Sequence, residues 1–416
     1  MLSASGCPPT SNSWNQNRGD IANTDQMLAG PSDRGLGTTA TVFVGKTAVQ
    51  TSPVIDSSGH VFVSIGDGTS SGPGNALVEV SGGPTPTVVN QISLTGLIST
   101  PAVEESGNVY VSVFSPGGSA RVVGLSSSLK PVFDTPIPGH VATIGPPKIF
   151  KFNNQMLIFV IFSGGEPSGG HLWMLNRGGE KIGDVWFCGD FTTTGQPPSI
   201  ALNPGHGAAI RRARADGQVY VVAAADICGV RQILLTPGAN PGDPPILTPS
   251  KIFYDDDTDK LYCDPVITGE DQVLLVTDRN NDAFWMRSYD LATGDEKWKK
   301  SLDNWLSDSP ALDPFQVSSA YGVQLPTDSQ FAELLKFDLQ SSGNTAAPVP
   351  VDNSASAIAV ARQKIFVVTQ KAIQVFDLDL NPKAVVPFAG LSPLAVGVDG
   401  AVYGIDAKGT LFRIGP

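Results

Sequence analysis

The sequence predicts an all-β protein, a single eight-bladed β-propeller made of four-stranded antiparallel blades. Two observations carry this prediction. Glycine (45 residues) and proline (33 residues) punctuate the whole chain, which is typical of many short strands joined by turns. One sequence unit also recurs along the chain, and repetition at this spacing is typical of propellers. The length of 416 residues exceeds the usual size of one core, but each added blade supplies its own slice of core.

The repeated unit opens with Ser-Pro or Thr-Pro, continues with a short apolar run and a polar glycine turn, and ends in an alternating strand. Ser52-Pro53 leads to Val61-Phe62-Val63 in this way, and Thr100-Pro101 leads to Val109-Tyr110-Val111. Six further starts follow at Gly145-Pro146, Gly207-Ala208, Asp264-Pro265, Ser309-Pro310, Ala355-Ser356 and Ser392-Pro393. Four of the seven intervals lie in the forties, the span that four short strands and their turns require.

The last unit is one strand short, because the chain stops soon after Thr410–Ile414. The segment Thr39–Val44 has the alternation of the missing strand, so we expect it to pair with the blade formed by residues 392–414. Such closure removes two exposed sheet edges; the alternative is an independent N-terminal strand. We therefore divide the chain into a tail or tether (1–34) and one propeller domain (35–416).

Charge and composition exclude two classes of function. The net charge is −12, the opposite of what a phosphate-binding surface requires, so nucleic acid is not expected as a partner. No run of eighteen apolar residues is present, so no membrane span is expected. Cys188, Cys228 and Cys263 fall in the middle of the chain. Either two of them form one disulfide between neighbouring blades, or they are buried free thiols.

The segment from Tyr289 to Trp298 (YDLATGDEKW) resembles the repeat consensus of quinoprotein-type, PQQ-like propellers, A-x-D-x-x-T-G-x-x-x-W. Weaker copies occur at Phe337-Asp338-Leu339 and Phe376-Asp377-Leu378, and Trp14 with Arg18-Gly19-Asp20 resembles the segment that precedes such propellers. The resemblance extends from about Trp14 to Pro416. It implies that the Asp, Gly and Trp of the repeat serve turn geometry and packing between blades.

The family that this chain resembles has a catalytic and a non-catalytic branch. The first contains quinone-dependent dehydrogenases, which hold their cofactor over a vicinal disulfide and bind calcium. The second contains scaffolds such as the propeller lipoprotein of the bacterial outer-membrane assembly machinery. This sequence has no adjacent cysteines, so the resemblance implies the scaffold branch, and no cofactor is predicted.

Two acidic runs, Asp255–Asp259 and Asp278–Asp282, contain the oxygen ligands that calcium prefers. Neither has the ordered spacing and glycine of a calcium-binding loop. We interpret both as solvated turns, with calcium binding as the alternative.

His140 and His206 share a Pro-Gly-His context, each just ahead of a new blade. Equivalent loops of a propeller converge near its central channel, so these two histidines are candidates for the channel face. A metal site needs three or four protein ligands, and the sequence indicates no others. The alternative is a pair of turn residues that repeat an ancestral pattern.

Ala4-Ser5-Gly6-Cys7 has the small-small-Cys ending of a bacterial lipoprotein cleavage site. The charged and apolar regions of a signal peptide do not precede it. Lipidation of Cys7 and an ordinary tail cysteine are both left open.

The sequence predicts a non-catalytic scaffold of the bacterial envelope or extracellular space. The protein would be periplasmic, bound to the cell surface or secreted, and a lipid anchor is one alternative. Its partner is expected to be a protein bound through the loop face, where Thr192–Gly207 and Thr236–Pro249 are the longest irregular stretches. No catalytic motif is present, so no catalytic residue is predicted. The alternative is a quinone-dependent dehydrogenase-like enzyme or a carbohydrate-binding module that uses the central funnel.

Overall fold

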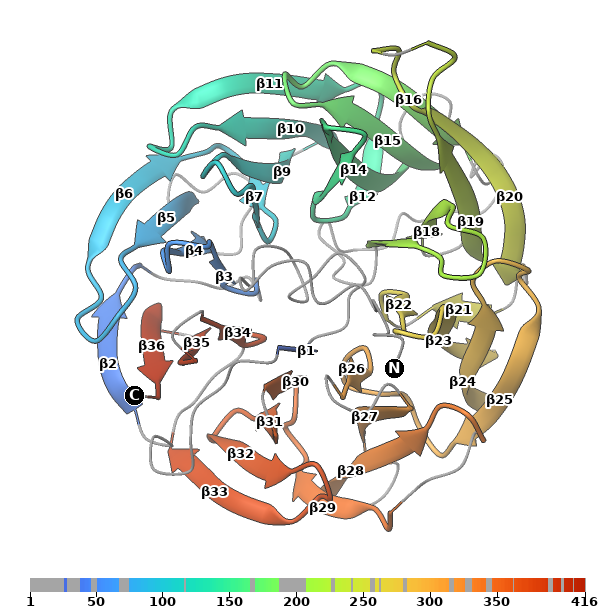
Figure 1. The fold of residues 1–416 in the computed structure, drawn as a ribbon. Coiled ribbons are helices and arrows are strands. Elements are labelled where there is room, and N and C mark those ends of the chain that lie inside the picture. Colours follow the sequence, from blue (N-terminus) through green and yellow to red (C-terminus); the bar gives the residue numbers. More distant parts are fainter. Residues whose placement is uncertain are drawn as a thin grey trace, which may run out of the picture.

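A computed structural model shows eight antiparallel sheets arranged as blades around one axis (Figure 1). The structure describes residues 26–27, 38–45, 51–66, 75–115, 117–164, 169–186, 207–225, 229–240, 242–254, 259–261, 263–279, 283–313, 318–325, 331–341, 346–361, 363–387, 392–397, 400–406 and 408–415. Within these residues every regular element is a strand. The predicted eight-bladed all-β propeller is therefore confirmed.

The blades are numbered along the chain, and the strands of each are given from the axis outwards. Blades 1 and 2 contain β3 (Val54–Ile55), β4 (Val61–Ile65), β5 (Ala76–Val80) and β6 (Val88–Ser93), then β7 (Leu97–Ile98), β8 (Ala102–Val103), β9 (Val109–Ser115), β10 (Ser119–Leu125) and β11 (Pro131–Ile137). Blades 3 and 4 contain β12 (Val141–Ile144), β13 (Lys148–Phe152), β14 (Gln155–Gly164), β15 (Gly170–Asn176) and β16 (Lys181–Trp186), then β17 (Ala208–Arg212), β18 (Val219–Ala225), β19 (Gly229–Thr236) and β20 (Ile246–Tyr254).

The second half of the ring repeats this order. Blades 5 and 6 contain β21 (Asp259–Leu261), β22 (Val266–Ile267), β23 (Gln272–Arg279), β24 (Ala283–Asp290) and β25 (Glu296–Leu302), then β26 (Ala311–Leu312), β27 (Ser319–Gln324), β28 (Phe331–Asp338) and β29 (Val349–Asp352). Blades 7 and 8 contain β30 (Ala357–Ala361), β31 (Lys364–Val368), β32 (Ala372–Asp377) and β33 (Pro382–Pro387), then β34 (Ala395–Val396), β35 (Val402–Ile405), β36 (Thr410–Ile414) and β2 (Thr38–Phe43).

Burial along the strands follows their distance from the axis. All five residues of β4 are buried, whereas β6, the outermost strand of the same blade, alternates between exposed and half-buried positions. The apolar clusters lie between blades: Phe62 and Leu77 of blade 1, for example, pack with Val109 and Val111 of blade 2. Each blade therefore buries its faces against its neighbours rather than within itself.

Proline divides the innermost strand in three blades. In blades 2, 3 and 5 the innermost position is shared by two short strands, both of which pair with the second strand. The breaks fall at Pro101, at Pro146-Pro147 and at Pro265, because proline has no N–H to donate to the ladder. These three blades therefore begin one strand earlier than the repeat predicts.

The hydroxyl residues that open the repeats join neighbouring blades. The Ser52 amide donates to Thr100 Oγ1 at 3.3 Å, and Ser64 Oγ donates to the Ser99 carbonyl at 2.7 Å, both between blades 1 and 2. Ser112 Oγ donates to the Gly145 carbonyl at 2.8 Å, between blades 2 and 3. The residues that open the repeats thus take part, with serines of the second strands, in hydrogen bonds between blades 1, 2 and 3 that satisfy buried polar groups.

The predicted closure through the termini is confirmed. β2 pairs antiparallel with β36, and Val42 lies opposite Leu411. The strand begins one residue earlier than the predicted Thr39–Val44, and the Val44 amide extends the pairing by donating to the Gly409 carbonyl at 2.9 Å. The N-terminal strand thus completes blade 8 as its outermost strand (Figure 1).

A further strand lies within the segment 1–34 that the sequence predicted to be a tail. β1 (Gln26–Met27) pairs in parallel with β30, with Gln26 opposite Val360. Figure 1 shows β1 near the middle of the ring, on the inner edge of blade 7. The chain therefore adds its own backbone beside the axis before it completes blade 8.

Deletion of residues 1–45 is expected to lower the melting temperature by about 5 °C or more and to promote aggregation. The deletion leaves the outer edge of β36 unpaired and removes Val44, which is buried in the core shared by blades 7, 8 and 1. Differential scanning calorimetry and light scattering measure the two effects. A deletion of residues 1–25, which keeps β1 and β2, is the control. A 1–45 deletion that melts like the full chain and stays monomeric contradicts the closure.

Candidate interaction face

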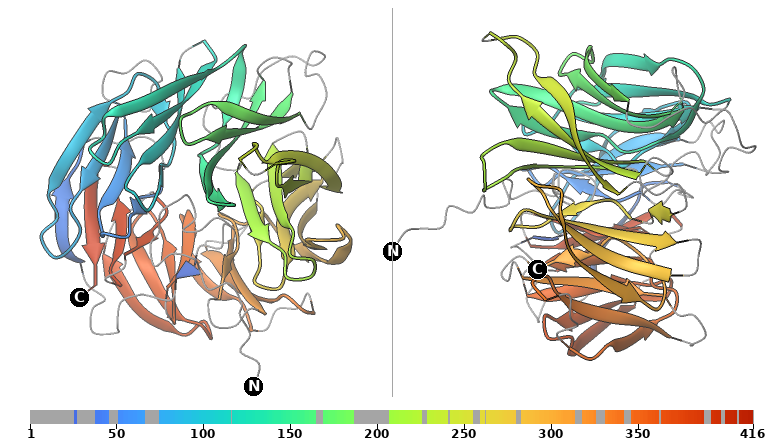
Figure 2. Two further views of the ribbon diagram at one scale, coloured as in Figure 1. Left: turned by 45° about the horizontal axis from the view of Figure 1, so that its top comes forward. Right: turned by 90° about the vertical axis from the view of Figure 1, so that its right-hand side faces the viewer.

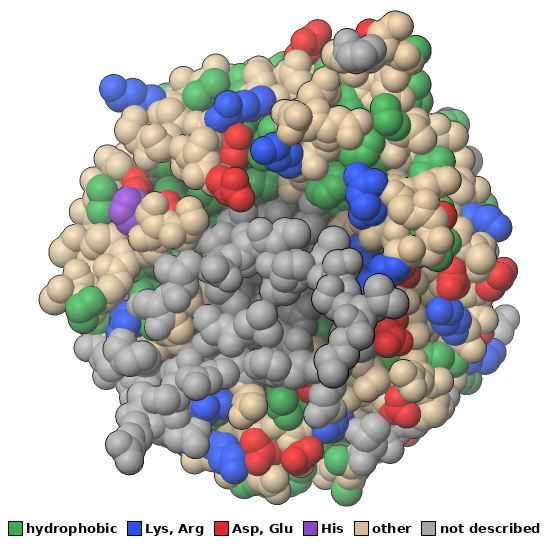
Figure 3. Space-filling model, in the orientation of Figure 1, with side chains coloured by type: hydrophobic (Ala, Val, Ile, Leu, Met, Phe, Trp, Pro, Cys, Tyr) green, Lys and Arg blue, Asp and Glu red, His purple; other side chains and the backbone are tan. Residues whose placement is uncertain are grey.

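The propeller has two faces that differ in the segments exposed on them. One, here called the turn face, carries the turns between the first and second strands and between the third and fourth strands of each blade. The opposite face carries the turns between the second and third strands and the connections from blade to blade. The hairpin between β19 and β20 projects from the turn face (Figure 2), which is the face presented in Figures 1 and 3.

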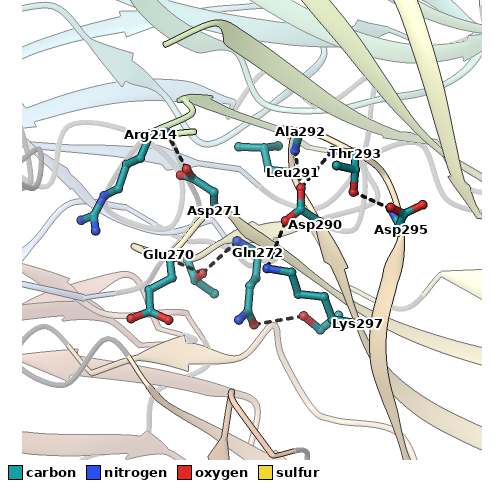
Figure 4. A network of polar contacts seen from close by, with 12 residues as sticks. Arg214, Glu270, Asp271, Gln272, Asp290, Leu291, Ala292, Thr293, Asp295 and Lys297 are labelled. Carbon is teal, nitrogen blue, oxygen red and sulfur yellow. Dashed lines mark hydrogen bonds and ion pairs between the residues drawn. The ribbon is translucent and has the colours of Figure 1, made fainter. Parts of the chain in front are cut away.

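The turn between the third and fourth strands is built around an aspartate in three blades. In blade 5, Asp290 Oδ1 accepts the amides of Ala292 (3.0 Å) and Thr293 (2.9 Å) (Figure 4). Gly294, at φ +77°, completes this turn in a conformation that other residues rarely adopt. Asp338 and Asp377 make equivalent bonds in blades 6 and 7. The predicted role of the repeat aspartate in turn geometry is confirmed.

The carbonyl of the next residue, a leucine, accepts a hydrogen bond from the preceding blade. In blade 6 the Leu339 carbonyl accepts from Trp298 Nε1 of blade 5 at 2.8 Å. In blade 7 the Leu378 carbonyl accepts from Lys336 Nζ at 2.8 Å and from the Tyr321 hydroxyl at 3.0 Å, both of blade 6. The Asp-Leu turn is thus the point at which each of these blades is bound to its predecessor.

Blade 5 receives the same kind of donor from blade 4. Gln232 Nε2 donates to the Leu291 carbonyl, and Leu291 itself is fully buried. The predicted role of Trp298 in packing between blades is confirmed, and its indole N–H adds a hydrogen bond that the repeat alone does not predict.

Buried tyrosines donate hydrogen bonds to carboxylates in the turns between the first and second strands. The Tyr110 hydroxyl donates to Glu104 Oε2 at 3.0 Å, and the Tyr220 hydroxyl donates to Asp216 Oδ2 at 2.6 Å. Burial, together with the neighbouring carboxylate, raises the pKa of both Tyr110 and Tyr220 to about 12. These hydroxyls stay protonated at neutral pH and act as hydrogen-bond donors rather than as bases.

Two ion pairs between blades also lie at these turns. Arg177 Nε of blade 3 lies 3.2 Å from Glu104 Oε2 of blade 2. Arg211 Nε of blade 4 lies 2.9 Å from Asp271 Oδ1 of blade 5, and the second oxygen of Asp271 accepts the Arg214 amide. Because the Arg211–Asp271 pair is largely buried, removal of either partner would leave an uncompensated charge out of water, which is strongly destabilising.

Two exposed arginines follow Arg211 in the chain. They are Arg212 at the end of β17 and Arg214 in the turn that follows. Figure 3 shows Lys and Arg side chains on this face around the central area, among them several over blades 3 and 4. Sequence reasoning missed this group, although Arg211-Arg212-Ala213-Arg214 is an unusual run in a chain of net charge −12.

The structure places only one of the two candidate channel histidines. His140 is exposed on the connection between blades 2 and 3, with its Nδ1 3.1 Å from the Gly117 carbonyl oxygen. His206 lies outside the described residues, so their approach stays a prediction. Elsewhere, His60 Nδ1 lies 2.9 Å from Glu79 Oε1, and the buried His171 lies 3.2 Å from Asp184.

Most of the predicted calcium ligands and cysteines lie outside the described residues: Asp255–Thr258, Asn280–Asp282, Cys7, Cys188 and Cys228. Cys263 is buried. Among the residues that are described, no three His, Cys, Asp or Glu side chains are grouped to hold a metal ion. Nor does the described part contain a helix long and apolar enough to cross a membrane.

One predicted loop needs correction and the other lies mostly outside the described residues. Thr236–Pro249 was expected to be irregular, but Ile246–Pro249 belongs to β20. Pro249 is tolerated there because β20 is the outermost strand of its blade, where a missing N–H breaks no ladder. Of Thr192–Gly207, only Gly207 is described.

Comparison with known proteins agrees with the propeller fold. No protein-family model matches the sequence, and no curated protein matches it. Among solved structures, the chain is similar to BamB from Moraxella catarrhalis, with a TM-score of 0.59 and 10% identity over 92% of this chain and 100% of that chain. It is also similar to Sqt1 from Saccharomyces cerevisiae, with a TM-score of 0.62 and 10% identity over 94% of this chain and 100% of that chain.

A third similar structure is the Dos1 propeller, with a TM-score of 0.60 and 10% identity over 94% of this chain and 97% of that chain. At this level of identity the likeness defines the protein as a β-propeller and establishes nothing about its activity.

Replacement of Lys336 by Met is expected to lower the free energy of unfolding by about 1–3 kcal/mol, the cost of removing a buried charged donor. Lys336 Nζ contacts both the Leu378 carbonyl and Asp379 from a side chain that is 10% exposed. Lys371→Met is the matched control, because Lys371 is 76% exposed in its ion pair with Asp352, and it should cost about 0.5 kcal/mol or less. Equal losses in urea denaturation of the two variants would count against the inter-blade role.

The Asp377 turn is expected to lose stability in acid. Burial alone would raise the pKa of Asp377, but the hydrogen bond from Asn381 and the contact with Lys383 outweigh it and bring the pKa to about 2. The unfolded value is about 3.9, so this carboxylate stabilises the fold above about pH 4 and ceases to do so as the pH falls towards 2.

Asp377→Asn, measured by denaturation at several pH values, should flatten the fall in unfolding free energy between pH 4 and pH 2. Asp295→Asn is the control for loss of one negative charge from an exposed turn. An unchanged pH profile in Asp377→Asn shows that the carboxylate is not coupled to folding.

Proposed function

We propose that this chain is a non-catalytic scaffold that recognises a protein partner through the turn face. One observation carries the proposal. On that face, the half-buried donor Trp298, the buried donor Lys336 and the buried carboxylate Asp271 are used in bonds between blades. Exposed side chains such as Lys151 and Arg214 remain on the surface. Turns held in place before binding lose little conformational entropy on association, which favours a docking surface.

The central funnel is less suited to a small ligand on the side of blade 7. β1 runs beside the axis and pairs with β30 along the inner edge of that blade. This observation favours the turn face over the funnel, and so favours the scaffold over the alternatives of a quinone-dependent enzyme or a carbohydrate-binding module.

We also propose a place for the chain in the quinoprotein-type propeller family and in the bacterial envelope or extracellular space. The Asp-Leu turns with their donors from the preceding blade support the family assignment, because they give the repeat consensus a structural role. Lipid anchoring through Cys7 and secretion are proposals that rest on the sequence alone.

Affinity capture with the full chain, from extracts of the organism that makes it, is expected to identify a protein that then binds in purified form by calorimetry. Hydrogen–deuterium exchange of the complex should show protection in turn-face segments such as 104–108 and 211–218, with little change at 368–372 on the opposite face. Protection confined to the opposite face contradicts the proposal. Saturable quenching of tryptophan fluorescence by pyrroloquinoline quinone with calcium supports the catalytic alternative instead.

A further inference from the structure

We propose that the outer edge of blade 1 is a self-association surface, on which β6 pairs antiparallel with β6 of a second copy of this chain. This surface lies on the rim of the propeller rather than on the turn face, so it goes beyond the proposed function. Three observations support it: the composition of the outermost strands, the direction of the backbone groups of β6, and the distribution of charge.

Most of the outermost strands are protected against pairing with another chain. Within the part of the chain that the structure describes, no strand pairs with the outer edge of these strands, and such an edge presents N–H and C=O groups to any other strand. Proline and charged residues block this pairing. Six outermost strands contain them: Pro131 in β11, Lys181 in β16, Pro249 in β20, Lys299 in β25, Pro350 in β29 and Pro382 in β33. Only β6 and β2 contain neither, and they belong to the neighbouring blades 1 and 8 (Figure 1).

β6 lies in the longest uncharged stretch of the chain. No Asp, Glu, Lys or Arg occurs between Glu79 and Glu104, so the strand and the connections on both sides of it carry no charge. β2, by contrast, is followed three residues later by Lys46. Val88 and Val89 of β6 are also 43% and 47% exposed. β6 is therefore the outermost strand with the least protection against pairing.

The hydrogen bonds between β6 and β5 determine which backbone groups of β6 are directed outwards. The Leu94 amide, just after β6, donates to the Asn75 carbonyl at 3.0 Å. Bonded and non-bonded pairs alternate along an antiparallel ladder. Ile92 and Asn90 are therefore bonded to β5 in the same way as Leu94.

Gln91 and Ser93 alternate with these bonded residues, so their backbone N–H and C=O groups point away from β5. The side chains of both residues are exposed. A second β6, related to the first by a two-fold axis, offers the same donors and acceptors in the opposite direction. Each copy can thus satisfy the outward groups of the other, and the two copies of blade 1 form one continuous sheet.

The distribution of charge favours contact between two copies at this edge over contact elsewhere. Each chain has a net charge of −12, so two copies repel each other in general. The strands of blade 1 contain one charged residue, Glu79, and those of blade 8 contain one, Arg413; both are buried. Pairing through β6 therefore places no like charges opposite each other.

The dimer is expected to be weak, because the interface is small. Pairing of one short strand buries less surface than the roughly 1,000 Å² of a typical stable interface. We expect a dissociation constant of about 10–100 µM, so the chain is monomeric at about 1 µM. Added salt should strengthen the dimer, because it screens the repulsion between two chains of the same sign.

Sedimentation velocity of the full chain between about 1 and 300 µM should show a reversible equilibrium between monomer and dimer. Gln91→Pro should raise the dissociation constant roughly tenfold or more, because proline removes an outward N–H and places its ring on the edge. Pairing of β6 with β5 does not use this N–H, so blade 1 keeps its own ladder. Gln91→Lys should also weaken the dimer, because it adds a hydrated charge to both of the paired strands.

Val385→Lys is the matched control for Gln91→Lys. It adds the same charge to β33, the outermost strand of blade 7, at a side chain that is 64% exposed. It should leave the dissociation constant nearly unchanged. Hydrogen exchange at high and low protein concentration locates the interface: exchange should slow in residues 88–93 at high concentration and stay unchanged in residues 382–387. Circular dichroism and melting temperature of the monomers confirm that each variant is folded.

Three results overturn the inference: a chain that stays monomeric over this concentration range, equal dissociation constants for the native chain and Gln91→Pro, or a dimer that protects other segments and not β6. If the native chain is monomeric and β6 is protected only when the partner protein binds, the edge takes a strand of the partner, and pairing with a second copy is wrong. The proposed function does not depend on these outcomes, because the turn face lies outside the paired strands.

Discussion

The second half of the ring depends on the hydrogen bonds that blades 4, 5 and 6 each donate to the Asp-Leu turn of the following blade. A four-stranded blade has two apolar faces and cannot bury either by itself, so the blades are stable only as neighbours. Apolar packing between blades is strong but not directional, whereas a donor that must reach one carbonyl sets the position of two blades. Trp298 to Leu339 and Lys336 to Leu378 are such contacts. Closer to the axis, the Thr100 hydroxyl accepts the Ser52 amide between blades 1 and 2, and Ser309 Oγ donates to the Asp264 carbonyl between blades 5 and 6.

Pairing between the two ends of the chain also joins neighbouring blades. Pairing of β2 with β36 makes the last blade from both termini, so the ring has no unpaired strand within blade 8. The core that joins blades 7, 8 and 1 includes Val44 from the N-terminal side and Ile414 from the C-terminal side.

The sequence was sufficient for the architecture but not for the surface. The eight starts, the missing fourth strand and the turn-forming role of Asp290 follow from local patterns with a direct physical meaning, and the structure has all of them. The split inner strands were missed, although Pro101 and Pro265 mark them, because two strands on one ladder look like one interrupted run. β1 could not be predicted, since two residues carry no periodicity and their parallel partner lies more than three hundred residues away.

The arrangement of side chains on the turn face could not be predicted from the sequence pattern either. The run at Arg211–Arg214 is visible in the sequence. Its arginines differ in role, because Arg211 is largely buried and paired with Asp271 of the neighbouring blade, whereas Arg212 and Arg214 are exposed and form no ion pair with the described residues. The sequence alone could not show this difference. The histidines singled out from the sequence are placed only in part, because His206 lies outside the described residues.

The central claim is that donors on one blade hold the turn of the following blade, and native-state hydrogen exchange of Trp298→Phe tests it most directly. Removal of the indole N–H leaves Trp298's own blade intact and takes a donor from the Leu339 carbonyl of blade 6. The account predicts faster exchange at the amides of Leu339 and Gln340 and unchanged exchange at Ala292 and Thr293 in blade 5. Unchanged exchange in blade 6, or acceleration confined to blade 5, would contradict it.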